Sequence, residues 1–184
     1  MVCTGNTCRS PMAEAILRDH LHRRGVAARV HSAGTLAWRG GASEGARDAL
    51  RERGLDAGSH RSRRLDADLV GGADLVLAMT RTHAWAVARH ATGADRRTFL
   101  PAELARLGGL VGPPTPGETV AEWAGRVAAR RPDPRVPGRA GEEVADPAGE
   151  PLAVYRATAA RLDVDLARVA DLLVASLSPD PPDG

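Results

Sequence analysis

A short, continuously apolar run, ADLVLAM from Ala73 to Met79, is the feature that most constrains how this chain can fold. An uninterrupted apolar run of this length indicates a strand that is buried on both faces. Such strands occur in parallel sheets that helices cover on both sides. Helix-like stretches alternate with strand-like stretches around this run, and this alternation predicts an α/β fold.

The other elements are predicted from helical spacing, from breakers and from short apolar runs. Ser10 is expected to cap the first helix, with Pro11 as its first residue and Gly25 just past its end. Residues 107–117 contain four Gly and three Pro and are expected to form a loop. The predicted helices are Pro11–Arg23, Ser43–Arg53, Arg81–His90, Glu118–Arg130 and Pro151–Leu177, and the other predicted strands are Ala28–Ser32 and Thr98–Leu100.

Length and composition favour one soluble domain. The 184 residues, 43% of them hydrophobic, suffice for a buried core, which we expect over residues 1–177, with 178–184 as a disordered tail. No apolar run approaches the ~20 residues of a membrane span, and no signal-peptide pattern opens the chain. The two cysteines, Cys3 and Cys8, fit a reducing compartment, so we expect a cytoplasmic protein.

The charge pattern gives no sign of a nucleic-acid-binding surface. All 25 basic residues are Arg, yet 23 acidic residues are interleaved with them and the net charge is only +2. This balance is typical of a solvated, mixed-charge surface. We therefore expect no nucleic-acid partner and no membrane partner, and a monomer or weak dimer.

The opening of the chain carries the functional signal. Cys3 and Arg9 are separated by five residues, and Ser10 and Pro11 then begin a helix; the five intervening residues are Thr4, Gly5, Asn6, Thr7 and Cys8. Five short residues allow main-chain N–H groups to turn inward, where they and the helix dipole favour a phosphate. Arg9 has the geometry to clamp two phosphate oxygens. The pattern predicts an anion-binding loop.

A cysteine at the base of such a positive loop is favoured as the thiolate and is placed for in-line attack on phosphorus. Cys3 is therefore the predicted nucleophile. A metal site is the weaker interpretation, because there are no other cysteines and no histidine at a matching spacing. A loop that binds phosphate without turnover stays open as an alternative. No metal and no organic cofactor is implied.

The string VCTGNTCRSPMAEA closely resembles the active-site loop of the low-molecular-weight protein tyrosine phosphatases, a family that includes bacterial protein arginine phosphatases. The resemblance continues in HSAGT, GSHRSRRL, ADLVLAMTRTH and ADPAGEPLAVYR, and thus spans most of the chain except residues 102–143. It implies a bacterial hydrolase with a single domain, a four-stranded parallel sheet with helices on both faces, and a two-step reaction through a phosphocysteine.

The family begins with a full strand before its nucleophile, whereas only Met1 and Val2 precede Cys3. We therefore expect the first strand to be truncated and the true start to lie upstream. A poorly held nucleophile would leave a non-catalytic phosphate-binding module, which is the alternative from a different functional class.

The resemblance assigns roles residue by residue. Cys3 matches the nucleophile, Arg9 the phosphate clamp, and Ser10 the hydroxyl that hydrogen-bonds the thiolate. Residues Thr4 to Cys8 match the phosphate-binding loop.

Three further residues match a supporting network. Asn6 matches the side chain that props the loop, together with Ser32 and His60. Without the resemblance, Ser32 is simply a strand-end hydroxyl and His60 a surface histidine. Both interpretations remain open for these two residues.

The general acid is expected at one of three Asp-Pro pairs, which begin at Asp133, Asp146 and Asp180. Asp146 precedes the last helix and matches the family's acid, so it is the predicted proton donor and the later base for water. The family usually carries an aromatic residue after this pair, where this chain has Ala148. One wall of the substrate slot is therefore absent.

The substrate is not fixed by the sequence. Thr7 stands where tyrosine phosphatases of this family commonly have a bulkier aliphatic residue, and it resembles the arginine-phosphatase variant. Trp38 matches an aromatic wall that would stack on a phenol or on a guanidinium. The family as a whole favours phosphotyrosine as the substrate, with phosphoarginine as the alternative; in both cases the partner is a phosphorylated protein.

The remaining histidines are given no catalytic role. His20 and His22 fall on different faces of a helix and are expected to be exposed. His83 and Trp85 are expected to be packing residues.

Overall fold

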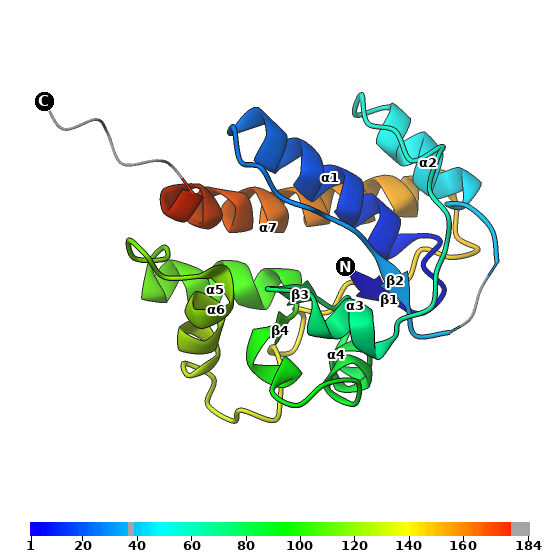
Figure 1. Cartoon of the computed structure of the whole chain (residues 1–184). Coiled ribbons are helices and arrows are strands. Elements are labelled where there is room, and N and C mark those ends of the chain that lie inside the picture. Colours follow the sequence, from blue (N-terminus) through cyan, green and yellow to red (C-terminus); the bar gives the residue numbers. More distant parts are fainter. Residues whose placement is uncertain (37–38, 178–184) are drawn as a thin grey trace, which may run out of the picture.

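The computed structural model of the protein describes residues 1–36 and 39–177. Trp38 and the predicted tail 178–184 lie outside the described residues. The helices are α1 Arg9–Arg23, α2 Glu44–Arg51, α3 Ala67–Gly71, α4 Arg81–Ala88, α5 Pro101–Val111, α6 Val120–Ala128 and α7 Leu152–Leu177, with a 3₁₀ turn at Ala94–Arg97; the strands are β1 Val2–Cys3, β2 Ala33–Gly34, β3 Val76–Leu77 and β4 Thr98–Phe99. Helices and short strands alternate, as the sequence predicts (Figure 1).

The strands are parallel, but they do not form the predicted continuous four-stranded sheet. β1 pairs with β2, and β3 pairs with β4, in two separate two-stranded sheets. A single parallel bridge between Val2 and Ala78 links the two pairs. The four-stranded sheet is therefore not confirmed, and what joins the halves is one bridge at the level of the opening loop.

The strand predicted over Ala28–Ser32 is wrong, because pairing starts only at Ala33. A cavity of about 660 Å³ lies beside this stretch, with Val30 on one wall and Leu75 among the residues on the other. The carbonyls of Val30, His31 and Ser32 accept hydrogen bonds from Arg18, from the Met1 amino group and from Arg63, and not from a neighbouring strand. The extended stretch therefore does not become part of a ladder.

Helix α1 starts two residues earlier than predicted. Cys8 is its N-cap residue, without a capping side-chain hydrogen bond, so Ser10 is not the cap and Pro11 is not the first helical residue. The reason is that the Ser10 hydroxyl bonds Asn6 and contacts Cys3 instead of capping the main chain. Gly25 does follow the helix end, with the positive φ of 73° that suits glycine.

Helix α5 occupies part of the stretch that glycine content predicts to be loop. Residues 107–111 are helical, and only the continuation from Gly112 is not. A Cβ at Gly108 would stand 2.6 Å from the Leu172 side chain of α7. Glycine at this position thus allows α5 to lie close to α7, and the packing outweighs the low helix propensity of glycine.

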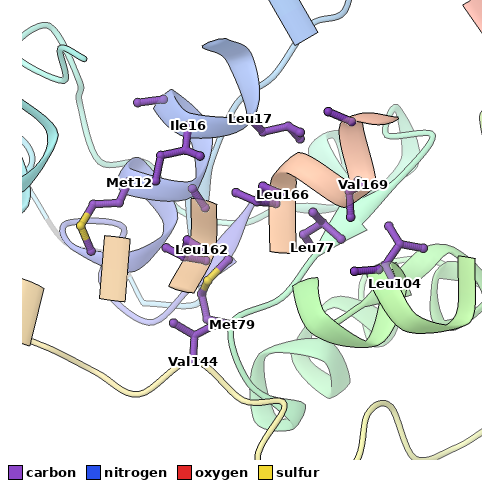
Figure 2. Close-up of a cluster of buried hydrophobic side chains, with 14 of the residues drawn as sticks. Met12, Ile16, Leu17, Leu77, Met79, Leu104, Val144, Leu162, Leu166 and Val169 are labelled. Atoms are coloured by element: carbon purple, nitrogen blue, oxygen red, sulfur yellow. The ribbon is translucent and has the colours of Figure 1, made fainter. Parts of the chain in front are cut away.

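The core lies where α1, α5 and α7 meet the strands. Helices α1, α2 and α7 pack against one another, and α5 also packs on α7 (Figure 1). Figure 2 shows side chains of α1, α5, α7 and β3 converging on one apolar cluster; the residues labelled there are Met12, Ile16, Leu17, Leu77, Met79, Leu104, Val144, Leu162, Leu166 and Val169. Burial of this cluster fixes the start of α1, and with it the opening loop.

His20 is buried, contrary to the sequence prediction. It lies on the side of α1 that faces α7, where its Nε2 is 2.8 Å from Oδ1 of Asp163. The hydrogen bond to a polar partner on the neighbouring helix offsets the free-energy cost of burying the imidazole. His22 is exposed, as predicted.

Candidate active site

The loop from Thr4 to Cys8 connects β1 to α1 and forms the floor of the candidate site. Its main-chain N–H groups make no hydrogen bond within the part of the chain that the structure describes. The start of α1 lies at the end of the same loop, so the helix dipole adds positive potential there. Main-chain donors without partners at a helix N-terminus favour a bound anion.

Arg9 closes this loop from α1. The residue is 5% exposed. Its Nη2 donates a 2.6 Å hydrogen bond to Oδ2 of Asp146, and its Nη1 donates to the Val144 carbonyl at 3.2 Å. The Arg9 Nε is buried and has no partner among the described residues. A buried, unused donor beside unused N–H groups leaves part of the guanidinium available to an anion.

Cys3 lies at the base of the loop and is 2% exposed. Its Sγ is 3.0 Å from the Ser10 Oγ. Because that Oγ already accepts a 2.9 Å hydrogen bond from Asn6, the Ser10 hydroxyl hydrogen is available to the sulfur. A hydrogen bond donated in this way stabilises the thiolate form.

Asn6 holds the loop in shape. It is the one described non-glycine residue with a positive φ, at 55°, a conformation that asparagine tolerates better than most residues. Its Nδ2 donates both to Ser10 and, at 2.7 Å, to the Ser32 Oγ, and its Oδ1 accepts from the Arg63 main chain at 3.0 Å. Both hydrogens of this buried side-chain amide are donated, and these bonds stabilise the turn with its positive φ.

The other side of the Asn6 turn is held by the segment after α2. The Asn6 carbonyl accepts hydrogen bonds from His60 Nε2 and from the Ser62 hydroxyl, both at 2.8 Å. The structure thus brings Ser32 and His60 to Asn6, although His60 contacts its main chain and not its side chain. Sequence reasoning missed Ser62 and Arg63, which follow His60 directly.

Glu14 completes the network and was also missed. The Ser32 hydroxyl donates a 2.6 Å hydrogen bond to its Oε2. Glu14 lies on α1, one turn after Ser10, so its position on the loop side follows from helical spacing alone.

The end of β2 supports the loop through close main-chain contact. Thr35 and Leu36 donate main-chain hydrogen bonds to the carbonyls of Cys3 and Thr4, both at 3.0 Å. A Cβ at Gly34 would stand 2.6 Å from the Thr4 carbonyl oxygen. Only glycine allows this approach, which fixes the backbone next to Cys3.

Asp146 faces the loop from the segment before α7. Its side chain is 47% exposed and bonds Arg9 and, at 3.3 Å, the main-chain N–H of Ala148. Val144 anchors the segment, since its N–H donates to the Met79 carbonyl at 2.8 Å. Of the other candidates, Asp133 pairs with neighbouring Arg135, and Asp180 lies outside the described residues.

The second cysteine belongs to the wall of the loop. Cys8 Sγ is 3.2 Å from the Ser43 Oγ and 3.9 Å from the Tyr155 hydroxyl. The neighbouring Thr7 carbonyl accepts a 2.8 Å hydrogen bond from the Ser43 main chain, and its side-chain Oγ1 is 3.6 Å from Cys8 Sγ. Burial raises the pKa of the Tyr155 phenol, which stays protonated and can donate.

His83 joins the loop to α4, a contact that the sequence did not predict. Its Nε2 is 2.9 Å from the Thr4 Oγ1, and its Nδ1 is 2.9 Å from the Thr80 Oγ1. Burial, reinforced by the positive charge of Arg9, lowers the pKa of His83 to about 4. The imidazole is therefore neutral near pH 7. Trp85, on the same helix, is 51% exposed and is not a packing residue as predicted.

Two further findings concern a metal site and a membrane span. Among residues 1–36 and 39–177, no group of three or more His, Cys, Asp or Glu side chains has the geometry to hold a metal ion. The same residues include no helix that is long and apolar enough to cross a bilayer.

Fold and site together place Cys3 before a loop whose main-chain N–H groups have no partner among the described residues, and Arg9 after it. The family model described as "Low molecular weight phosphotyrosine protein phosphatase" matches residues 1–101. The chain belongs to this family, which confirms the resemblance inferred from the sequence.

Relatives of two kinds are similar to the chain. A protein-arginine-phosphatase of Geobacillus stearothermophilus is 35% identical over 173 residues, which cover 94% of this chain and 93% of that protein. A protein-arginine-phosphatase of Bacillus subtilis (strain 168) is 49% identical over 83 residues, and here the match spans 45% of this chain and 55% of that protein. The low molecular weight protein-tyrosine phosphatase A of Mycobacterium tuberculosis is 45% identical over 87 residues, 45% of this chain and 52% of that protein.

Solved structures show the same fold. The low molecular weight protein tyrosine phosphatase from T. tengcongensis superposes with a TM-score of 0.70 at 32% identity, over 94% of this chain and 96% of that chain. The single-domain α/β architecture is thereby supported.

Proposed function

We propose that the protein is a cysteine-dependent protein phosphatase that works through a phosphocysteine. The observation that carries this proposal is Cys3 directly before a loop whose five N–H groups have no partner among the described residues, with Arg9 directly after it. A bound phosphoryl group would meet donors on its oxygens and a sulfur nucleophile behind its phosphorus.

In the first step the Cys3 thiolate attacks phosphorus. A P–S bond forms while the bond from phosphorus to the leaving oxygen or nitrogen breaks. Asp146, in its acid form, transfers its proton to the leaving atom, so that a neutral phenol or a guanidinium departs. In the resting structure the Arg9 guanidinium binds Asp146. When the guanidinium binds the phosphoryl group instead, Asp146 becomes free to approach the leaving group.

In the second step Asp146, now a carboxylate, removes a proton from water. The water oxygen forms a bond to phosphorus and the P–S bond breaks. Inorganic phosphate leaves, the Cys3 thiolate is restored, and Asp146 again holds the proton that it lost. The Ser10 hydroxyl, 3.0 Å from Cys3, stabilises the sulfur when it departs as the thiolate.

The substrate that we favour is phosphoarginine on proteins. The relative that matches over nearly the whole chain is named a protein-arginine-phosphatase. Thr7 is a small, half-buried rim residue of the loop, and Ala148 after Asp146 offers no aromatic wall to a phenol. A guanidine leaving group, with a pKa near ~13 against ~10 for a phenol, also has the greater need for the proton of Asp146.

Phosphotyrosine is the second candidate. Tyrosine phosphatases are among the relatives, at 45% identity over 87 residues, which are 45% of this chain. Two peptides of one sequence, one with phosphoarginine and one with phosphotyrosine, separate the two. We expect a higher kcat/KM on phosphoarginine. A larger value on phosphotyrosine would reverse the assignment.

Thr7 offers a matched pair of variants for the same question. Thr7→Leu adds apolar bulk at the rim and is expected to move the preference toward phosphotyrosine. Thr7→Val keeps the shape and removes only the hydroxyl, so it reports the polar contribution alone.

The chemistry itself is tested with p-nitrophenyl phosphate at mildly acidic pH. Turnover by the wild type, absent in Cys3→Ser, is the expected result. If the wild type binds phosphate but does not turn over, the protein is the non-catalytic phosphate-binding module instead. Trapping of a phosphorylated Cys3 in the Asp146→Asn variant by mass spectrometry would identify the intermediate.

A further inference from the structure

His83 is a buried titratable side chain that reaches the phosphate loop from α4 and that the proposed reaction does not use. It comes from the first turn of α4 and is 5% exposed. Both ring nitrogens have a hydroxyl partner at 2.9 Å, Thr80 on one side and Thr4 on the other. The ring thus links the residue after Cys3 to the N-terminus of a separate helix.

The hydrogen bonds determine which nitrogen carries the proton. Thr80 is the N-cap of α4, and its Oγ1 accepts from the His83 main-chain N–H at 3.4 Å. The Thr80 hydroxyl hydrogen is then free to point at Nδ1, which acts as the acceptor of the neutral ring. The proton is therefore assigned to Nε2, which donates to the Thr4 Oγ1.

Thr4 is held from two directions. Its hydroxyl is held by His83, and its carbonyl accepts a 3.0 Å hydrogen bond from the Leu36 main chain. Its main-chain N–H is the first of the unused donors of the loop and lies one residue after the nucleophile. This N–H shares its peptide plane with the Cys3 carbonyl, which accepts a 3.0 Å hydrogen bond from the Thr35 main chain. The bond from His83 to the Thr4 hydroxyl holds the Cα end of the same peptide.

We propose that His83 is a positioning residue of the phosphatase reaction, which acts through the Thr4 hydroxyl to aim the Thr4 N–H at the phosphoryl group. The effect expected on turnover rests on the proposed function, whereas the effect expected on phosphate binding does not. A neutral ring suits the role. The charged groups within reach are Arg9 of α1, and Asp146 and Glu143 of the segment before α7.

A double-mutant cycle tests the proposal. Thr4→Val removes the hydroxyl and keeps the volume. His83→Asn keeps a polar group at the Nδ1 position for Thr80 but is too short to reach Thr4. We expect each single variant to weaken binding of inorganic phosphate, measured by calorimetry, and to lower kcat/KM on p-nitrophenyl phosphate, by about tenfold. The double variant should be no worse than either single one.

His83→Gln provides the rescue, because its longer side chain places a donor near the position of Nε2. It should stay within about threefold of the wild type in phosphate binding, whereas His83→Asn does not. Thr82→Val, one residue earlier on the exposed side of α4, is the matched control and should change neither quantity.

Two results would overturn the inference: independent effects that multiply to about a hundredfold in the double variant, or single variants that bind phosphate as the wild type does. If His83→Asn does not fold, Thr4→Val and His83→Gln still decide, since loss in the first and retention in the second are both required. Absence of turnover in the wild type would refute the proposed function alone, because the phosphate-binding cycle is read without it.

Discussion

The phosphate loop and the segment that carries Asp146 are held in opposite ways. Asn6 in the loop is completely buried, and every polar atom of its side chain has a partner on α1, before β2 or after α2. Asp146 is about half exposed, and its two partners are Arg9 and the nearby Ala148 N–H.

This difference matches two different chemical tasks. Anion binding and in-line attack need donors that are fixed before the substrate arrives. In the proposed reaction, Asp146 must first leave Arg9, then meet a leaving group and finally a water, so it needs freedom to move. The fold therefore places buried hydrogen bonds around the loop and leaves Asp146 at the surface.

The largest effect is expected where the two regions touch. Arg9→Lys keeps the charge but loses the planar fork that can hold a phosphoryl oxygen and Asp146 in turn. We expect kcat/KM on a phosphorylated peptide to fall about a thousandfold. Steady-state kinetics provides the measurement; a loss of less than tenfold would show that charge alone suffices.

Asp146→Asn should separate the two regions. Loss of the proton donor is expected to lower kcat by about a hundredfold on phosphopeptides, and by less on p-nitrophenyl phosphate, whose leaving group needs little protonation. Inorganic phosphate should bind more tightly than to the wild type, because the carboxylate no longer competes for Arg9. Calorimetry gives the affinity, and weaker phosphate binding would contradict the competition.

Asn6 tests how far the rigidity of the loop depends on one residue. Asn6→Ala removes three side-chain hydrogen bonds and places alanine at a φ of 55°, so we expect a loss of about 1–3 kcal/mol in the free energy of unfolding and about tenfold in kcat/KM. Asn6→Gly is the control, since it loses the same bonds without the backbone strain. Urea unfolding of both variants measures the difference, which should be about 1 kcal/mol.

A further prediction concerns the pH dependence of stability. The pKa of His83 is about 4 in the folded protein and near 6.5 when unfolded, so the unfolded chain binds the proton more readily. The contribution of neutral His83 to the free energy of unfolding is therefore complete above pH 6.5. It is lost as the pH falls toward 4, by roughly 3 kcal/mol at most. Melting temperatures from pH 7 to 4 should fall less steeply in His83→Gln. Parallel curves would show that His83 does not titrate in this range.

The sequence predicted local patterns better than long-range contacts. The loop residues and α1 lie within one short stretch, so their spacing is readable, and α7 follows from an apolar stripe of its own. The contact between Thr4 and His83, by contrast, joins residues 79 apart. His20 was assigned to the surface because its partner, Asp163, comes from a helix at the other end of the chain.

Propensity failed where packing decides. Glycine content predicted a loop from residue 107, but residues 107–111 are helical, and the missing side chain of Gly108 lets α5 lie close to α7. The predicted strand before β2 is wrong because a strand needs a neighbouring strand, and a cavity lies beside this stretch. The catalytic roles assigned to Cys3, Arg9 and Asp146 remain predictions until the variants are measured.

The contact between Arg9 and Asp146 has a consequence for the kinetics of encounter. In the resting protein the guanidinium already has a counter-anion at 2.6 Å, so this pair presents little net charge to a substrate approaching from a distance. Association should then depend weakly on ionic strength. Selection among anions occurs at contact, where a phosphoryl dianion displaces the carboxylate more readily than a singly charged anion such as chloride does.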